Sequence, residues 1–471
     1  MGKLRSTLQR WRLALLCVLL AISLGMVVVL AITEPSDSQP LGPFVGLWLA
    51  CFLPYIAACL LVLGTREQTG RTRWIELAVI MGGTLLLSIL FLGKDPNLSR
   101  DSWRYLWDAR VTLHGYSPYV YGPGDPKLLS LRDFLYDNSR FRNVPTLYPP
   151  FAEFVYLLSY LVAPANLAVL KSIFVGCDLL ICGLLILALQ KKGLDPARCI
   201  LYAWCPLPII EFALQGHVDV VAVLLTVGAI LSAQSQKRGA RALTGLCIAL
   251  ATLVKIYPIL LLLVVWRRRD WVLLLTCFGT IILAYIPYII LGHGQVLGFF
   301  GTYAGESSGN GGPVSLTARW LWLHVGLNGR LAGLFVYGVD ALFMGSVALL
   351  VFVLRQREQM GMEVSTLILV GAIFAISPHI FPWYTTALLV WIALVWRPLR
   401  TKSGRLDAGG LASVLAWYFP CATIGSYFLL GPHPNWTWYY VLVYGLTCVG
   451  LGVAIFLWRK QREKKMGEVS L

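Results

Sequence analysis

Runs of about twenty apolar residues recur along the chain between Trp11 and Trp458, and short basic loops separate them. A helix of that length crosses the roughly 30 Å hydrocarbon core of a bilayer. Hydrophobic residues make up 58% of the 471 residues and charged residues only 13%, about half the share usual in soluble domains. Because backbone polar groups in lipid must bond internally, we predict an all-α integral membrane bundle of about 12 to 14 helices.

The Lys and Arg residues, which give a formal net charge of +16, concentrate in the short loops between the apolar runs. This is the positive-inside pattern, and it predicts that both termini are cytoplasmic. Because membrane orientation explains the excess of basic residues, nucleic-acid binding is not needed to explain the net charge, and we exclude nucleic acid as a partner. In this arrangement six histidines fall on the opposite, outer face, where we expect the functional site: His114, His217, His293, His324, His379 and His433.

Hydropathy divides the chain into three parts. Residues 1–93 are predicted to form three transmembrane helices. Residues 94–164 form a first outer loop with interfacial helices. Residues 165–471 form the remaining bundle, which includes a second outer loop at 292–329.

The apolar segment 242–266 has basic clusters on both flanks, so a single crossing would place one cluster outside. We therefore predict a hairpin of two short helices with Lys255 near its tip. Broken helices of this kind are tolerated where they line a polar cavity.

A short helix is predicted at the start of the first outer loop, capped by Ser99 and ended by Gly115. Four polar residues share one of its faces at helical spacing: Asp101, Arg104, Tyr105 and Asp108. Three apolar residues occupy the other side: Trp103, Leu106 and Trp107. This pattern suits a helix lying in the membrane interface with its polar face toward water or a cleft. Alternatively, Asp101 simply stabilises the helix dipole.

Aromatic and carboxylate side chains together suit a sugar, which offers hydroxyls to acceptors and C–H faces to rings. The candidate sugar and acceptor contacts are Tyr105, Asp108, Tyr119, Tyr148, Glu211, His217, Asp219, His379, Trp383 and Tyr384. Candidates to hold a lipid phosphate are Lys255, Arg319 and Arg104. The alternatives are buried helix contacts, snorkelling cations and an aromatic interface belt. No clear metal-ligand set is present, although the outer histidines leave a divalent metal open.

Six blocks follow one another between Asp95 and Tyr384: Arg100–Asp108, His114–Tyr119, Leu147–Pro150, Glu211 with Gly216–Asp219, Lys255–Pro258 and Pro382–Tyr384. In residues and order they resemble the polytopic GT-C glycosyltransferases, and within them bacterial glycosyltransferase family 87 and the polyprenol-phosphate-mannose-dependent mannosyltransferases. Where relatives often have a second acidic residue, Arg100 precedes Asp101, so a paired-carboxylate site is not expected.

The resemblance implies a GT-C-type bundle in a bacterial plasma membrane, with its active site on the outer face. Such an enzyme moves a hexose, mannose in these relatives, from a polyprenyl-phosphate donor to a glycan or glycolipid acceptor. Asp101 would be the general base, and the sugar would be transferred with inversion. The alternative classes are a transporter or flippase of a lipid-linked sugar, and a lipid-linked polysaccharide polymerase or ligase.

Overall fold

The computed structural model describes residues 2–33, 42–299, 311–326, 330–401, 403–429 and 434–469. Over these residues the chain forms helices, with one isolated β-bridge between Arg400 and Leu406. The prediction of an all-α membrane protein is confirmed. Parts of the predicted second outer loop (300–310 and 327–329) and His433 lie outside the described residues.

Seven helical runs in the described chain are long and apolar enough to cross a membrane. They comprise α1 (Gly2–Ile32), α2 with α3 (Gly42–Ala50 and Phe52–Gly64), α4 (Gly70–Ile89), α8 (Leu167–Lys191), α14 (Trp271–Leu291), α17 (Arg330–Gln356), and a C-terminal run from α22 (Trp436–Tyr440) to α23 (Leu446–Val469). The segments Pro196–Ala203 and Pro206–Leu214 form a further candidate span, bent by 45°.

Six shorter apolar helices lie between these spans: α7 (Pro150–Val162), α11 (Asp219–Ala233), α12 (Ala240–Thr252), α18 (Met362–Ile376), α19 (Pro382–Val395) and α20 (Ala408–Ala422). Each has fewer than the roughly 20 residues needed to span the hydrocarbon core alone. Such a helix crosses only where the bilayer thins or a second short helix completes the span. The count of 12 to 14 spans is reached only if these helices also cross, so that number stays a prediction.

Burial separates the centre of the bundle from its lipid-facing surface. Along α19 almost every side chain is buried, and Trp391 is 1% exposed. By contrast α17 exposes large apolar side chains, with Leu342 at 73%. Such continuous apolar exposure would be costly in water, and it fits contact with lipid.

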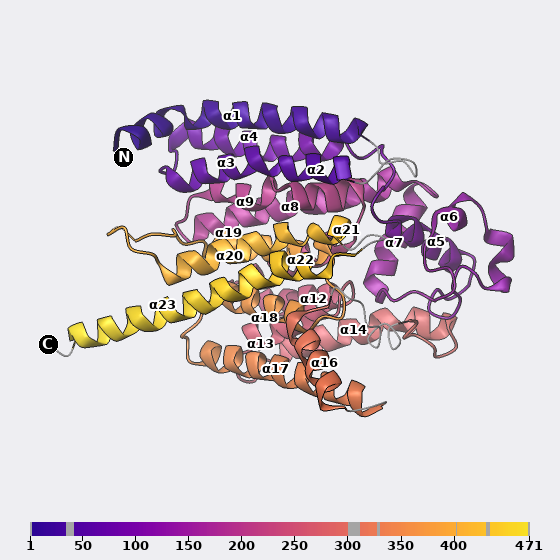
Figure 1. The fold of residues 1–471 in the computed structure, drawn as a ribbon. Helices are drawn as coiled ribbons and strands as arrows, with labels where there is room; N and C mark the ends of the chain where they lie inside the picture. The colour runs from indigo at the N-terminus through magenta and orange to yellow at the C-terminus, as the bar shows by residue number, and fades with distance from the viewer. Residues whose placement is uncertain are drawn as a thin grey trace.

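The basic loops converge at one end of the bundle. The buried Arg12 guanidinium donates to Glu76 at 2.6 Å and to Asp195 at 2.9 Å, which joins three of these loops. Lys192, in the same loop as Asp195, pairs with Glu363 at 2.8 Å and adds the loop before Met362. The N-terminal end of α1 and the C-terminal end of α23 lie at this same end of the bundle, opposite α5, α6 and α7 (Figure 1).

The hairpin predicted from the flanking charges is present. The helix α12 stops at Thr252, and the chain resumes as a 3-10 turn that leads into α13 (Leu261–Val265). Arg241, at the start of α12, donates to the carbonyl of Val265 at 2.9 Å, so the two flanks lie side by side. Lys255 therefore lies in the turn, at the opposite end of the hairpin from both basic clusters.

The first loop folds into a small helical layer made of α5 (Asp101–Leu113), α6 (Phe134–Asn138) and α7. The predicted interfacial face of α5 is wrong: Leu106 and Trp107 are 0% exposed. The Trp107 ring packs against Tyr136 at 5.7 Å, because the loop that follows α5 folds back over it. The predicted end of the helix is close to the observed one, since Gly115 adopts φ 79° just after Leu113.

Candidate functional site

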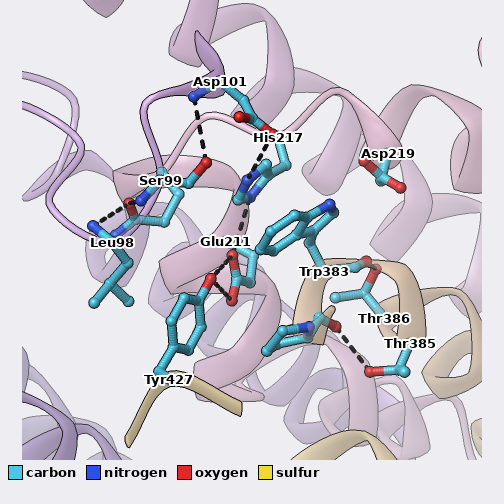
Figure 2. A network of polar contacts seen from close by, with 12 residues as sticks. Leu98, Ser99, Asp101, Glu211, His217, Asp219, Trp383, Thr385, Thr386 and Tyr427 are labelled. Carbon is cyan, nitrogen blue, oxygen red and sulfur yellow. Dashed lines mark hydrogen bonds and ion pairs between the residues drawn. The ribbon is translucent and has the colours of Figure 1, made fainter. Parts of the chain in front are cut away.

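Three segments that are distant in sequence meet at the end of the bundle opposite the basic loops. They are the start of α5, the turn before α11 and the turn that leads into α19, and Figure 2 shows their side chains converging. A carboxylate oxygen of Asp101 lies 4.0 Å from Nε2 of His217. The His217 ring stacks on Trp383 with 3.9 Å between ring centroids and 12° between planes.

Gln215 joins the turn before α11 to the chain entering α5. Its side-chain oxygen accepts from the backbone N–H groups of Leu98, at 2.9 Å, and Ser99, at 3.1 Å. Its amide nitrogen donates to the side chain of Asn97 at 2.7 Å. These three bonds from one buried side chain fix where α5 begins.

Gly216 allows the same turn to approach α5 closely. Its φ is 72°, and a Cβ atom there would lie 3.1 Å from Cβ of Ser102 and 3.2 Å from Cγ of Lys171. The buried Lys171 ammonium in turn donates to the carbonyls of Phe91, at 2.7 Å, and Lys94, next to the end of α4. Gly216 thus allows the turn to contact α5, and Lys171 fixes the chain that follows α4; no sequence pattern predicts either contact.

Asp101 is the first residue of α5 and keeps 21% of its side chain exposed. Its backbone N–H donates to Ser99 Oγ at 3.3 Å, but the predicted cap by Ser99 is wrong, because Arg100 is the N-cap residue and makes no side-chain cap bond. Burial raises the pKa of the Asp101 carboxyl above its usual range, while the Lys255 charge and the Ser99 hydroxyl oppose that rise. A carboxylate with a raised pKa is a stronger base at neutral pH.

Glu211 contacts His217 on the side of the ring away from Asp101. It lies on the π-helical segment Ile209–Leu214, a distortion often found at functional sites. Its carboxylate accepts the Tyr427 hydroxyl at 3.1 and 3.3 Å and lies 3.0 Å from Nδ1 of His217. These three side chains form a polar column in an apolar surrounding, with Glu211 and His217 0% exposed.

Trp383 is enclosed on both faces. His217 covers one face, and Phe381 stacks on the other at 4.6 Å and 2°. With 6% of the residue exposed, its ring faces are not available to a sugar in this arrangement. Its direct role in the structure is to hold the His217 ring in place.

A pocket of about 170 Å³ lies between the hairpin turn, α18 and α19. Its polar lining residues include Tyr148, Asp219, Lys255 and Tyr384. The Lys255 ammonium lies 3.2 Å from an Asp219 carboxylate oxygen and over the rings of Tyr148, at 5.0 Å, and Tyr384, at 4.8 Å. The rest of the lining is largely apolar and includes Val254, Ile256, Val370, Ile373 and Phe374. A lining with both polar and apolar side chains suits an amphipathic ligand.

Residues 146–378 match the model of glycosyltransferase family 87. The resemblance expected from the sequence is confirmed over these residues, and it supports a membrane glycosyltransferase with a donor and an acceptor substrate. The matched region contains Tyr148, Glu211, His217 and Lys255, whereas Asp101 precedes it. No curated protein and no solved structure gives a significant match.

Two predicted site residues stabilise the loop before the family 87 region. Arg104 donates to Asp108 at 2.8 Å and to the carbonyls of Phe141 and Val144 at 2.9 and 3.1 Å. All three guanidinium nitrogens are used, and Asp108 is 0% exposed. The predicted open polar face of α5 is therefore wrong beyond Asp101, because the loop's own carbonyls occupy it.

Two further predicted residues support Tyr148. The Tyr105 and Tyr148 hydroxyls are 3.0 Å apart, and the Tyr105 ring stacks on Tyr156 with centroids 4.3 Å apart. Tyr119 donates its hydroxyl to the Tyr148 carbonyl at 2.7 Å. These contacts set the angle at which Tyr148 enters the pocket wall.

The last two predicted residues lie at other places. His379 precedes α19 and is 8% exposed, with its ring parallel to Phe381 at 6.1 Å. Arg319 lies on α16 (Pro313–Val325) and interacts electrostatically with Asp340. It does not line the pocket that contains Lys255. In the described residues, no group of three or more His, Cys, Asp or Glu side chains could hold a metal ion.

Proposed function

We propose that this glycosyltransferase moves a hexose, mannose by its resemblance, from a polyprenyl-phosphate donor to a glycan or glycolipid acceptor on the non-cytoplasmic face. The observation that carries the proposal is the placement of Asp101 within electrostatic range of Lys255, which lines a pocket with both polar and apolar side chains. A base, a cation and an apolar surface are what this reaction needs together. The family 87 match supplies the reaction class.

In this mechanism Asp101 takes the proton of the acceptor hydroxyl. The acceptor oxygen attacks the anomeric carbon from the face opposite the phosphate, and the bond from that carbon to the phosphate oxygen breaks. The polyprenyl phosphate leaves with the electron pair, and the anomeric configuration inverts. Since the leaving group is already a good one, the protein mainly positions the reactants and balances the phosphate charge. Lys255 performs the second task.

The remaining residues take supporting roles in the proposal. Tyr148, Tyr384 and Asp219 line the donor pocket. Glu211 and Trp383 fix His217, which faces Asp101. His379 and Arg319 stay predicted contacts for the acceptor and the carrier, whereas Arg104 is left out because its nitrogens are used within the loop.

The sidedness rests on the basic loops. They gather at the end of the bundle where α1 begins and α23 ends. Loops rich in Lys and Arg favour the cytoplasmic side of the membrane. The Asp101 end would then face outward, within reach of an acceptor at the outer surface. This assignment supports an active site on the non-cytoplasmic face, and the family resemblance is the basis for proposing the bacterial plasma membrane.

The test is transfer by purified protein in proteoliposomes. Polyprenyl-phosphate mannose and other polyprenyl-phosphate hexoses are supplied with a panel of glycan and glycolipid acceptors, and products are identified by mass spectrometry and linkage analysis. Asp101→Asn should abolish transfer, while the exposed loop variant Asp137→Asn should retain it. Unchanged transfer by Asp101→Asn removes Asp101 as the base. Carrier movement across the bilayer without transfer supports the flippase instead.

A further inference from the structure

The Lys255 ammonium is not isolated in its pocket. Asp219 lies 3.2 Å away, so the two side chains together carry no net charge. Asp101 adds a second carboxylate within electrostatic range of Lys255. Because these carboxylates offset the charge of Lys255, the site attracts an anion less strongly than an unpaired lysine would.

The proposed reaction changes the charge of the phosphate. The donor is a phosphodiester with one negative charge. When the sugar–oxygen bond breaks, the leaving phosphate becomes a monoester whose second ionisation lies near pH 6, so above that pH it carries nearly two charges. The proton lost by the acceptor passes to Asp101, and the electron pair stays on the phosphate oxygen. Charge is therefore balanced, but the phosphate leaves more negative than it arrived.

Geometry limits how far Asp219 can be from this phosphate. An oxygen bound to the Lys255 ammonium would lie about 2.8 Å from it. Together with the 3.2 Å between Lys255 and Asp219, that places the carboxylate within about 6 Å of the bound oxygen. This is shorter than the screening length of about 8 Å in physiological salt, and the pair is mostly buried, at 14% and 7% side-chain exposure.

We propose, resting on the function proposed above, that Asp219 is a specificity-determining residue that favours the singly charged phosphodiester donor over the doubly charged monoester product. Asp219 lowers the affinity of both anions, and it lowers that of the dianion more. Release of the spent carrier is thereby promoted, and the free polyprenyl phosphate of the membrane is kept from occupying the site. Lys255 still provides enough attraction for the donor, whose chain adds apolar contact.

Other ionisable groups face this pair and set the background against which the effect is measured. Asp101, Glu211 and His217 interact with Asp219 or Lys255. Tyr148 and Tyr384 lie under the ammonium, and Tyr257 also lines the pocket. The ligands are therefore compared at one pH at a time, where these groups have the same charge for both.

The experiment measures equilibrium binding in nanodiscs of two probes, a short-chain polyprenyl monophosphate and its methyl phosphodiester. The ratio of their dissociation constants reports discrimination and does not require turnover. At pH 8, Asp219→Asn should shift this ratio about tenfold toward the monophosphate. At pH 5, where both probes carry about one charge, the variant and the wild type should differ little. Asp219→Glu should keep the wild-type ratio, as should the distant control Asp137→Asn.

An unchanged ratio in Asp219→Asn at pH 8 overturns the inference, as does a shift of equal size at both pH values. If that variant does not fold, Asp219→Ser is used with the same expectations. The proposed function fails on a different result, namely wild-type protein that shows no transfer and binds neither probe. Transfer by wild type with an unchanged ratio would retain the function and remove the role of Asp219.

Discussion

Nδ1 of His217 lies 3.0 Å from a Glu211 carboxylate oxygen, and Nε2 of the same ring faces Asp101 at 4.0 Å. If Nδ1 carries the proton toward Glu211, the lone pair of Nε2 is directed at the Asp101 side. Glu211 thus contacts the ring that faces the proposed base. Trp383 prevents that ring from turning away.

The first prediction concerns Glu211. Glu211→Gln should lower kcat up to about 100-fold with little change in donor KM, because a neutral amide no longer orients His217. Steady-state kinetics at several donor concentrations measure both constants. Tyr427→Phe keeps the ring and removes one donor to Glu211, so it should lower kcat less. A rise in donor KM as large as the fall in kcat would indicate a general loss of pocket structure instead.

The second prediction is a pH profile. Transfer requires the Asp101 carboxylate, and burial raises the pKa of that group, so the acid limb of activity should lie above the usual aspartate pKa of about 3.9. The Lys255 charge opposes this rise. Lys255→Met should therefore move the acid limb of the residual activity to higher pH. A limb that stays in place in Lys255→Met would show that another group titrates.

The third prediction links function to stability. The pKa of Asp101 is higher in the folded protein than in an unfolded chain, so its ionisation above that range destabilises the fold. Asp101→Asn should raise the unfolding temperature more at pH 7.5 than at pH 4, because a larger fraction of the carboxyl is protonated at the lower pH. Thermal unfolding in detergent at the two pH values measures this. A lower unfolding temperature at pH 7.5 would contradict the prediction.

Parts of the fold and site were predictable because the signals were local. The basic flanks of 242–266 required a hairpin, and the structure has one with Lys255 in the turn. Breaks in apolar runs pointed to Glu211, His217 and Asp219, which the fold brings near Asp101.

The sequence was misleading where distant segments decide burial. The α5 face looked amphipathic, but the following loop covers it, and Arg104 bonds to carbonyls that no periodicity announces. Tyr427 lies more than two hundred residues from its partner Glu211. Gln215 acts through backbone N–H groups, which any sequence provides. Contacts of these kinds carry no local pattern and appear only in three dimensions.

The fourth prediction separates backbone strain from close packing. Gly216 and Gly115 both have positive φ, of 72° and 79°, so alanine at either should cost about 1 to 2 kcal/mol. A Cβ at Gly115 meets nothing within 4 Å, whereas one at Gly216 meets Ser102 and Lys171. Gly216→Ala should therefore also displace α5 and reduce transfer, and Gly115→Ala should reduce stability alone. Denaturation and transfer assays on both variants measure the difference; equal activity losses would contradict it.

The fifth prediction tests the membrane orientation through the hairpin. Arg238 and Arg268 flank it, and the bond from Arg241 to Val265 shows that the two flanks are neighbours. Cysteines introduced at Arg238 and Arg268 should both react with a membrane-impermeant maleimide only after cells are permeabilised, while Asp137→Cys should react in intact cells. The native cysteines lie in apolar segments and provide the background signal in each experiment. Reaction of the two flanks from opposite sides would show that 242–266 crosses the membrane once, and would remove Lys255 from the side on which Asp101 lies.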